Sequence, residues 1–226
     1  MKNKALLFIL TQILTLTAVN PVVQANEFPV QARLFAGSTA INPSNLNQEL
    51  ANQNIKDFKS IANYGVEITY PVLKFLDAGM RYTKRSAFQD EVNSSSNTSY
   101  EATLSQDSIL LLTRAPLLKT DIVRLDAFVG VGGSNTTLTL KTATQDGEIS
   151  RRETNDWLAS PYASYGASLA IGYRQFYFII EAGYETNKVD SFKRSGNINN
   201  NIQNIDLSGG YASIGLLFDG ITAKSK

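Results

Sequence analysis

The sequence predicts an all-β protein, an eight-stranded antiparallel up-and-down transmembrane β-barrel. Apolar and polar residues alternate with a period of two in segment after segment, which is typical of strands with two different faces. Tight turns alternate with long polar loops between these segments. Glu181 stands in the middle of the most hydrophobic segment, YFIIEAGYE at 177–185. A strand of a barrel accommodates this carboxylate by turning it inward, away from lipid.

The N-terminal residues have the composition of a signal peptide. Lys2 and Lys4 precede a mostly apolar run, and Val23-Gln24-Ala25 places small residues where cleavage is expected. A transmembrane anchor is the alternative, but polar residues interrupt the run, and a spanning helix needs about 20 apolar residues. We therefore expect a signal peptide at 1–25 and an outer-membrane β-barrel at 26–226.

The alternation predicts eight strands. In YGVEITYP, for example, Tyr64, Val66 and Ile68 share one face, whereas Glu67 lies on the other. In the fourth strand, the stretch 106–116 (QDSILLLTRAP) carries a continuous apolar run that hides the phase, so its register cannot be assigned. The expected strands cover residues 28–40, 61–71, 75–90, 98–114, 122–139, 160–174, 176–188 and 203–218.

The connections differ in length at the two ends of the expected barrel. Tight turns are expected at 72–74, near 116–121 and at Gln175. Short turns at one end and long loops at the other are the layout of an outer-membrane barrel. Within the first long loop, residues 44–61 fit either a short amphipathic helix or a disordered loop. The long connections, rich in Asn, Ser and Gly, are 41–60, 91–97, 140–159 and 189–202.

Charged residues of both signs fall on the face opposite the apolar one. An eight-stranded barrel is only wide enough for its own side chains, and an unpaired charge inside it is costly. We therefore expect these residues to form a polar network that plugs the lumen, with an ion or substrate path as the alternative. The predicted network consists of Arg33, Glu67, Asp77, Arg81, Arg124, Asp126 and Glu181.

Several kinds of chemistry are not expected. The chain has no Cys and no His, which excludes disulfides and thiolate metal sites and removes the commonest general base. Gly130-Val131-Gly132-Gly133 is either a phosphate loop or a set of inward glycines, and the second reading is favoured because no helix pattern follows. We expect no catalytic residue, no cofactor and no metal. The 21 basic and 20 acidic residues nearly balance, so no nucleic acid is expected.

The signal peptide, YGVEITYPV…LDAGMRY, LDAFVGVGG and SGGYASIGLLF together resemble the small outer-membrane β-barrel families of the OmpX, OmpA transmembrane-domain and OmpW type. The resemblance implies a Gram-negative outer membrane, contact with its lipid and lipopolysaccharide, and insertion by the barrel-assembly machinery. Hydrolytic outer-membrane barrels rely on His, which this chain lacks. One departure concerns the C-terminus: such barrels usually end on an aromatic residue, whereas DGITAKSK follows Phe218 here.

Three functions fit this sequence. The first is a structural or surface-interaction role, in which the long outer loops meet a surface, host or prey ligand. The second is a narrow channel or transporter for small hydrophobic molecules, as the resemblance to the OmpW type implies. The third is a soluble lipocalin-like binding barrel, which the inward charges and outward apolar residues disfavour. The sequence does not separate the first two.

Overall fold

The structure, a computed structural model, describes residues 29–52, 55–93, 98–144, 147–154, 160–189, 193–195 and 205–222. The predicted signal peptide lies outside these residues. The main strands are β1 (Pro29–Ala40), β2 (Ser60–Leu73), β3 (Leu76–Asn93), β4 (Thr98–Lys119), β5 (Val123–Thr144), β7 (Pro161–Tyr173), β8 (Phe176–Val189) and β11 (Gly209–Thr222). Shorter elements are α2 (Ser44–Asn52), β6 (Gly147–Thr154), β9 (Lys193–Ser195) and β10 (Ile205–Asp206).

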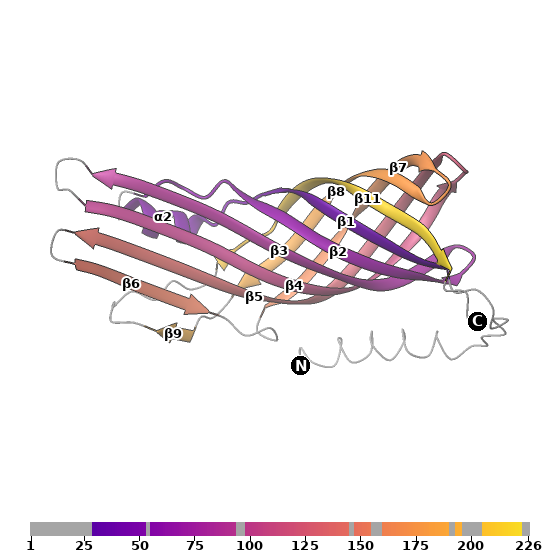
Figure 1. The fold of residues 1–226 in the computed structure, drawn as a ribbon. Helices are drawn as coiled ribbons and strands as arrows, with labels where there is room; N and C mark the ends of the chain where they lie inside the picture. Colours follow the sequence, from indigo (N-terminus) through magenta and orange to yellow (C-terminus); the bar gives the residue numbers. More distant parts are fainter. Residues whose placement is uncertain are drawn as a thin grey trace, which may run out of the picture.

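The eight main strands close into a barrel in chain order. Each pairs antiparallel with the next, and β11 returns to pair with β1. Both ends of the described chain therefore lie at the same end of the barrel (Figure 1). The predicted fold, an eight-stranded antiparallel up-and-down barrel, is confirmed.

β3, β4 and β5 carry the sheet beyond the barrel (Figure 1). β4 begins at Thr98, as expected, whereas β3 and β5 continue past their expected ends at 90 and 139. β3 and β4 remain paired as far as Asn93 and Thr98, and β5 remains paired with β4 to Ala143. The prediction of a loop throughout 140–159 is wrong, because β6 forms a hairpin with the outer half of β5. The sequence of β6, GEISRRET, contains only one large apolar residue, Ile149, so it lacks the alternation that marks the barrel strands.

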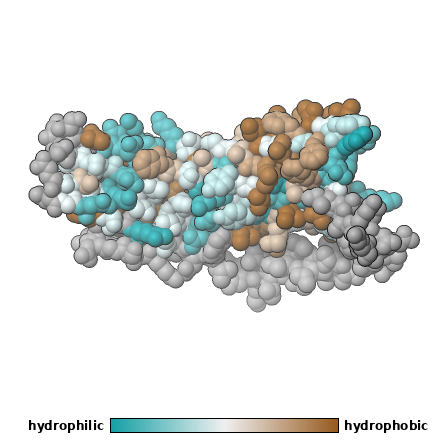
Figure 2. Space-filling view, viewed as in Figure 1, coloured by the Kyte–Doolittle hydropathy of each residue, from teal (hydrophilic) through white to brown (hydrophobic). Residues whose placement is uncertain are grey.

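The outer surface of the barrel carries an apolar belt. Figure 2 shows hydrophobic residues gathered over one half of the molecule and hydrophilic ones over the end formed by β3 to β6. On β8, Phe178 and Ile180 are exposed while Glu181 is buried, so the predicted phase is confirmed for this strand. A soluble protein rarely exposes so continuous an apolar surface, whereas lipid requires one. The chain is therefore an outer-membrane barrel. The layout of short turns and long loops predicts that the β3–β6 extension lies on its outer side.

Aromatic residues mark both edges of the belt. Tyr165 and Tyr184 are register partners on β7 and β8, with ring centroids 6.0 Å apart, at the edge near the extension. Phe176 and Phe218 meet edge to face, 5.2 Å apart, at the turn end. Such girdles lie at the two membrane interfaces of outer-membrane barrels.

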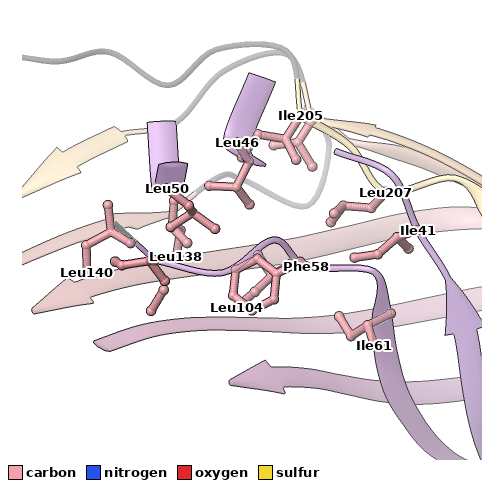
Figure 3. Packing of buried hydrophobic residues seen from close by; sticks show 13 residues of the cluster. Ile41, Leu46, Leu50, Phe58, Ile61, Leu104, Leu138, Leu140, Ile205 and Leu207 are labelled. Atoms are coloured by element: carbon pink, nitrogen blue, oxygen red, sulfur yellow. The ribbon is translucent and has the colours of Figure 1, made fainter. Parts of the chain in front are cut away.

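A separate apolar core closes the outer end of the barrel. Of the two readings left open for 44–61, the helix is the one found, over Ser44–Asn52. Leu46 and Leu50 of this helix are fully buried against Leu104 of β4 and Leu138 of β5 (Figure 3). Asn47 fastens the helix to the next segment by exchanging hydrogen bonds with the backbone of Phe58 (2.9 and 3.2 Å). Within the described chain, no helix is long and apolar enough to cross a membrane.

Candidate functional site: the charged interior of the barrel

The interior contains equal numbers of positive and negative side chains. All seven residues predicted for the lumen network are buried on inward positions of their strands, with at most 4% of their surface exposed. Three more buried charged residues join them. In the described part of the chain, the buried charged residues are five arginines and five carboxylates: Arg33, Arg81, Arg85, Arg114, Arg124, Glu67, Asp77, Asp126, Glu181 and Glu185.

The central layer joins two carboxylates through two arginines. Arg81 donates to Glu67 from Nε (2.8 Å) and Nη2 (2.7 Å), and its Nη2 also reaches Glu181 (2.9 Å). Arg114 makes a similar bridge, with Nη2 at 2.8 Å from Glu67 and 2.7 Å from Glu181. The Tyr211 hydroxyl donates to Glu181 (2.9 Å). Charge-assisted bonds of this kind are the strongest hydrogen bonds in proteins, and here they tie β2, β3, β4, β8 and β11 together.

A second layer lies toward the turn end of the barrel. Arg124 donates to Asp77 (2.6 Å) and to Asp126 (2.7 Å). Arg33 pairs with the other oxygen of Asp126 (2.5 Å), and its Nη1 donates to Ser168 (3.0 Å). Ser168 also accepts from Arg114 of the central layer (3.2 Å), so the two layers are continuous.

A third layer separates the central one from the apolar core. Arg85 forms an ion pair with Glu185 and donates to the Tyr162 hydroxyl (2.7 Å). The Tyr162 hydroxyl in turn donates to Glu185. Thr39 donates to Glu185 (3.1 Å) and accepts from the Asn63 amide (3.0 Å). The interior therefore passes from charged layers to an apolar core at its outer end.

Aromatic rings cover the arginines of the central layer. The Arg81 guanidinium lies 4.7 Å from the centroid of Phe35 and 4.9 Å from that of Phe128, and Arg114 lies 4.5 Å from Phe128. A guanidinium against a ring face is attracted by the quadrupole of the ring. Phe35 and Phe128 thus fill the space in the lumen that the ion pairs do not occupy.

Sequence reasoning missed Arg85, Arg114 and Glu185. Arg114 lies in the strand with the continuous apolar run, and only the pairing of Arg114 with Asp77 shows that it faces inward. The other two carried a readable signal. Arg85 has the same phase as Arg81, and Glu185 has the same phase as Glu181. Continuing the alternation for four more residues along each of these strands would have found both.

The glycine-rich stretch has a structural role. Gly130 and Gly132 lie in the middle of β5, where the strand pairs with β4. A Cβ at Gly132 would lie 1.9 Å from the Ile109 carbonyl oxygen. The stretch is thus part of a strand whose backbone lies close to that of β4, and it is not a phosphate loop. Within the described residues, no group of three or more acidic residues is placed to hold a metal ion.

No family model matches this sequence, and no curated protein does. Solved outer-membrane barrels are similar in fold. Ail of Yersinia pestis is 14% identical over 86% of this chain and 98% of its own, with a TM-score of 0.42. A major outer membrane protein of Thermus thermophilus is 9% identical over 84% of this chain and 99% of its own, with a TM-score of 0.48. The outer membrane protease OmpT of Escherichia coli is 10% identical over 90% of this chain and 99% of its own, with a TM-score of 0.38.

Proposed function

We propose that this protein is a plugged outer-membrane barrel without enzymatic activity, which acts at the cell surface through the structures on its outer side. The observation that carries the proposal is the balanced network of five arginines and five carboxylates in the lumen. Each of these carboxylates is bound by at least one arginine.

The network supports a closed lumen for two reasons. Its layers span the section between the aromatic girdles, and Ser168 links two of them through hydrogen bonds from Arg33 and Arg114. Opening a water path would separate ion pairs that are hidden from water, and breaking such a pair costs several kcal/mol. A narrow channel for hydrophobic molecules would require the same separation, so the plugged barrel is the better supported of the two readings.

The absence of enzymatic activity is part of the same proposal. A general acid or base needs a carboxyl group that is within reach of substrate and free to exchange a proton. The lumen carboxylates are buried and bound to guanidinium groups, as for Glu67 between Arg81 and Arg114. We therefore assign them to structure and not to catalysis.

The outer extension supports an interaction role. β3 to β6 continue the sheet beyond the belt, and α2 packs on it through a core of its own. A folded platform presents side chains in fixed positions, which lowers the ordering cost of binding a partner. A ligand at a host or prey surface would meet this side of the barrel first.

Planar-bilayer recording tests the closed lumen. The wild-type protein should show little or no steady conductance, whereas Arg81→Ala should raise transient openings because Glu67 and Glu181 both lose a partner. Lys141→Ala, which removes a charge from the extension, is the matched control and should stay closed. Stable, large openings of the wild-type protein would replace the proposal with a channel. Shortening 140–159 or 189–202 should abolish surface binding while the barrel still assembles.

A further inference from the structure

The outer wall of the barrel carries an apolar groove across β11, β1, β2 and β3. Its volume is about 510 Å³, and it lies open along its length on the lipid-facing surface. Ala36 forms the floor, because it lies on the outward face of β1 between its register partners Tyr64 and Ile214. The methyl group of Ala36 leaves a depression between these two larger side chains. Leu34 and Leu216, one step nearer the turn end, continue the lining.

The groove faces the outer leaflet of the membrane. Tyr64, at its upper end, is exposed on the side of the belt near the extension. Tyr82, the register partner of Val66, lies one step nearer the turn end. Ile68 and Tyr70 continue the same face of β2 toward the turn end, below the groove. A tyrosine at the edge of an apolar belt lies at the membrane interface. The groove therefore begins at the outer interface and descends into hydrocarbon, where the acyl chains of lipids surround the barrel.

A lysine lies at the upper end of the groove. Lys84 is the register partner of Tyr64 on the neighbouring strand, half-buried on the outward face of β3. In the part of the chain that the structure describes, no hydrogen bond or ion pair is recorded for Lys84. Its other register partner, Asp107, accepts a hydrogen bond from the Tyr82 hydroxyl (2.5 Å). A lysine at this depth lays its stem on apolar surface and holds its ammonium at the interface, where it binds phosphate as a point charge.

We propose that this groove is a specific site for a phosphorylated, multiply acylated lipid of the outer leaflet, the lipid A part of lipopolysaccharide. One acyl chain lies over Ala36 between Tyr64 and Ile214, and a phosphate lies on Lys84. The outer-leaflet position selects lipid A over phospholipid of the inner leaflet. The carboxylate of Asp107 repels the phosphate, so replacing Asp107 by a neutral residue should strengthen lipid A binding. The inference rests on the outer-membrane location and is independent of the plugged lumen.

Lipid retention tests the site. The protein is purified from outer membranes in mild detergent, and the lipid A and phospholipid that remain bound are quantified by mass spectrometry during successive washes. Ala36→Leu fills the groove with an apolar side chain that lipid tolerates on this face. Its control is Ala182→Leu, an outward alanine of β8 outside the groove. Lys84→Gln removes the phosphate partner, and Lys188→Gln on β8 is its control.

The wild-type protein and both controls should retain lipid A. Lys84→Gln should retain roughly fivefold less, the effect expected for one basic residue at a membrane surface. Ala36→Leu should also lose lipid A, and Asp107→Asn should retain more. Gel mobility of unheated samples verifies that each variant is folded. Equal retention in all variants would overturn the site. Retention of phospholipid in preference to lipid A, or equal loss in the controls, would overturn it as well.

Discussion

Arg81 and Glu67 face each other directly across the β2–β3 pair, and the guanidinium of Arg81 donates two hydrogen bonds to one oxygen of Glu67. Arg114, from the next strand, binds the same carboxylate with Nε (2.5 Å) and Nη2 (2.8 Å). Glu67 is thus the point where β2, β3 and β4 are joined inside the barrel.

Glu67→Ala should destabilise the barrel by about 3–5 kcal/mol, because it leaves three buried arginines, Arg33, Arg81 and Arg114, short of a partner. The measurement is equilibrium unfolding by urea in lipid vesicles. Glu101→Ala is the control, since Glu101 pairs with Lys141 at 3.4 Å on the exposed extension, and such surface pairs contribute about 0–1 kcal/mol. An equal decrease in the free energy of unfolding in the two variants would contradict the role given to Glu67.

The two faces of β8 should respond in opposite ways to charge. Ile180→Lys places an ammonium in the apolar belt and should cost roughly 2–4 kcal/mol or block insertion. Glu181→Gln keeps the shape and some hydrogen bonds of the buried residue, and the barrel should still assemble. Gel mobility of unheated samples reports assembly. Equal assembly of the two variants would show that the phase of β8 is wrong.

Gly132→Ala should disrupt the β4–β5 pair, because the new Cβ would lie 1.9 Å from the Ile109 carbonyl oxygen. The backbone has to move there, so we expect weaker pairing and a lower yield of folded protein. Gly210→Ala is the matched control, since the nearest atom to its Cβ would be 3.9 Å away. If Gly132→Ala folds as well as Gly210→Ala, the close approach of β4 and β5 does not constrain this position.

The outer core should unfold separately from the barrel. Leu50→Ala removes a fully buried side chain from α2, a change that typically costs about 2–5 kcal/mol. Because the core lies outside the belt, we expect faster proteolysis within 41–60 while the barrel keeps its mobility on unheated gels. Ala51→Ser, at an exposed position of the same helix, should leave the rate unchanged. A barrel that is itself destabilised by Leu50→Ala would show that the two parts unfold together.

The sequence by itself determined the barrel and most of its inward face. Alternation is a local property: in a half-buried strand each residue faces lipid or lumen according to its place in the pleat. The phase of Glu181 and of Arg81 was therefore readable from their immediate neighbours. Turn and loop lengths are also local, and with the even number of strands they predicted which end of the barrel faces outward.

Only the tertiary structure decided what each inward residue meets. Arg114 could not be assigned to the lumen from its own apolar segment, and only pairing with β3 and β5 sets its register. β6 of the outer extension was missed for a related reason. Its residues are mostly polar, so it shows no apolar face, and its pairing with β5 depends on contacts that short-range patterns do not encode. The partners in the lumen come from strands distant in the sequence, because closing the barrel is what brings Glu181 to Arg81 and Arg114.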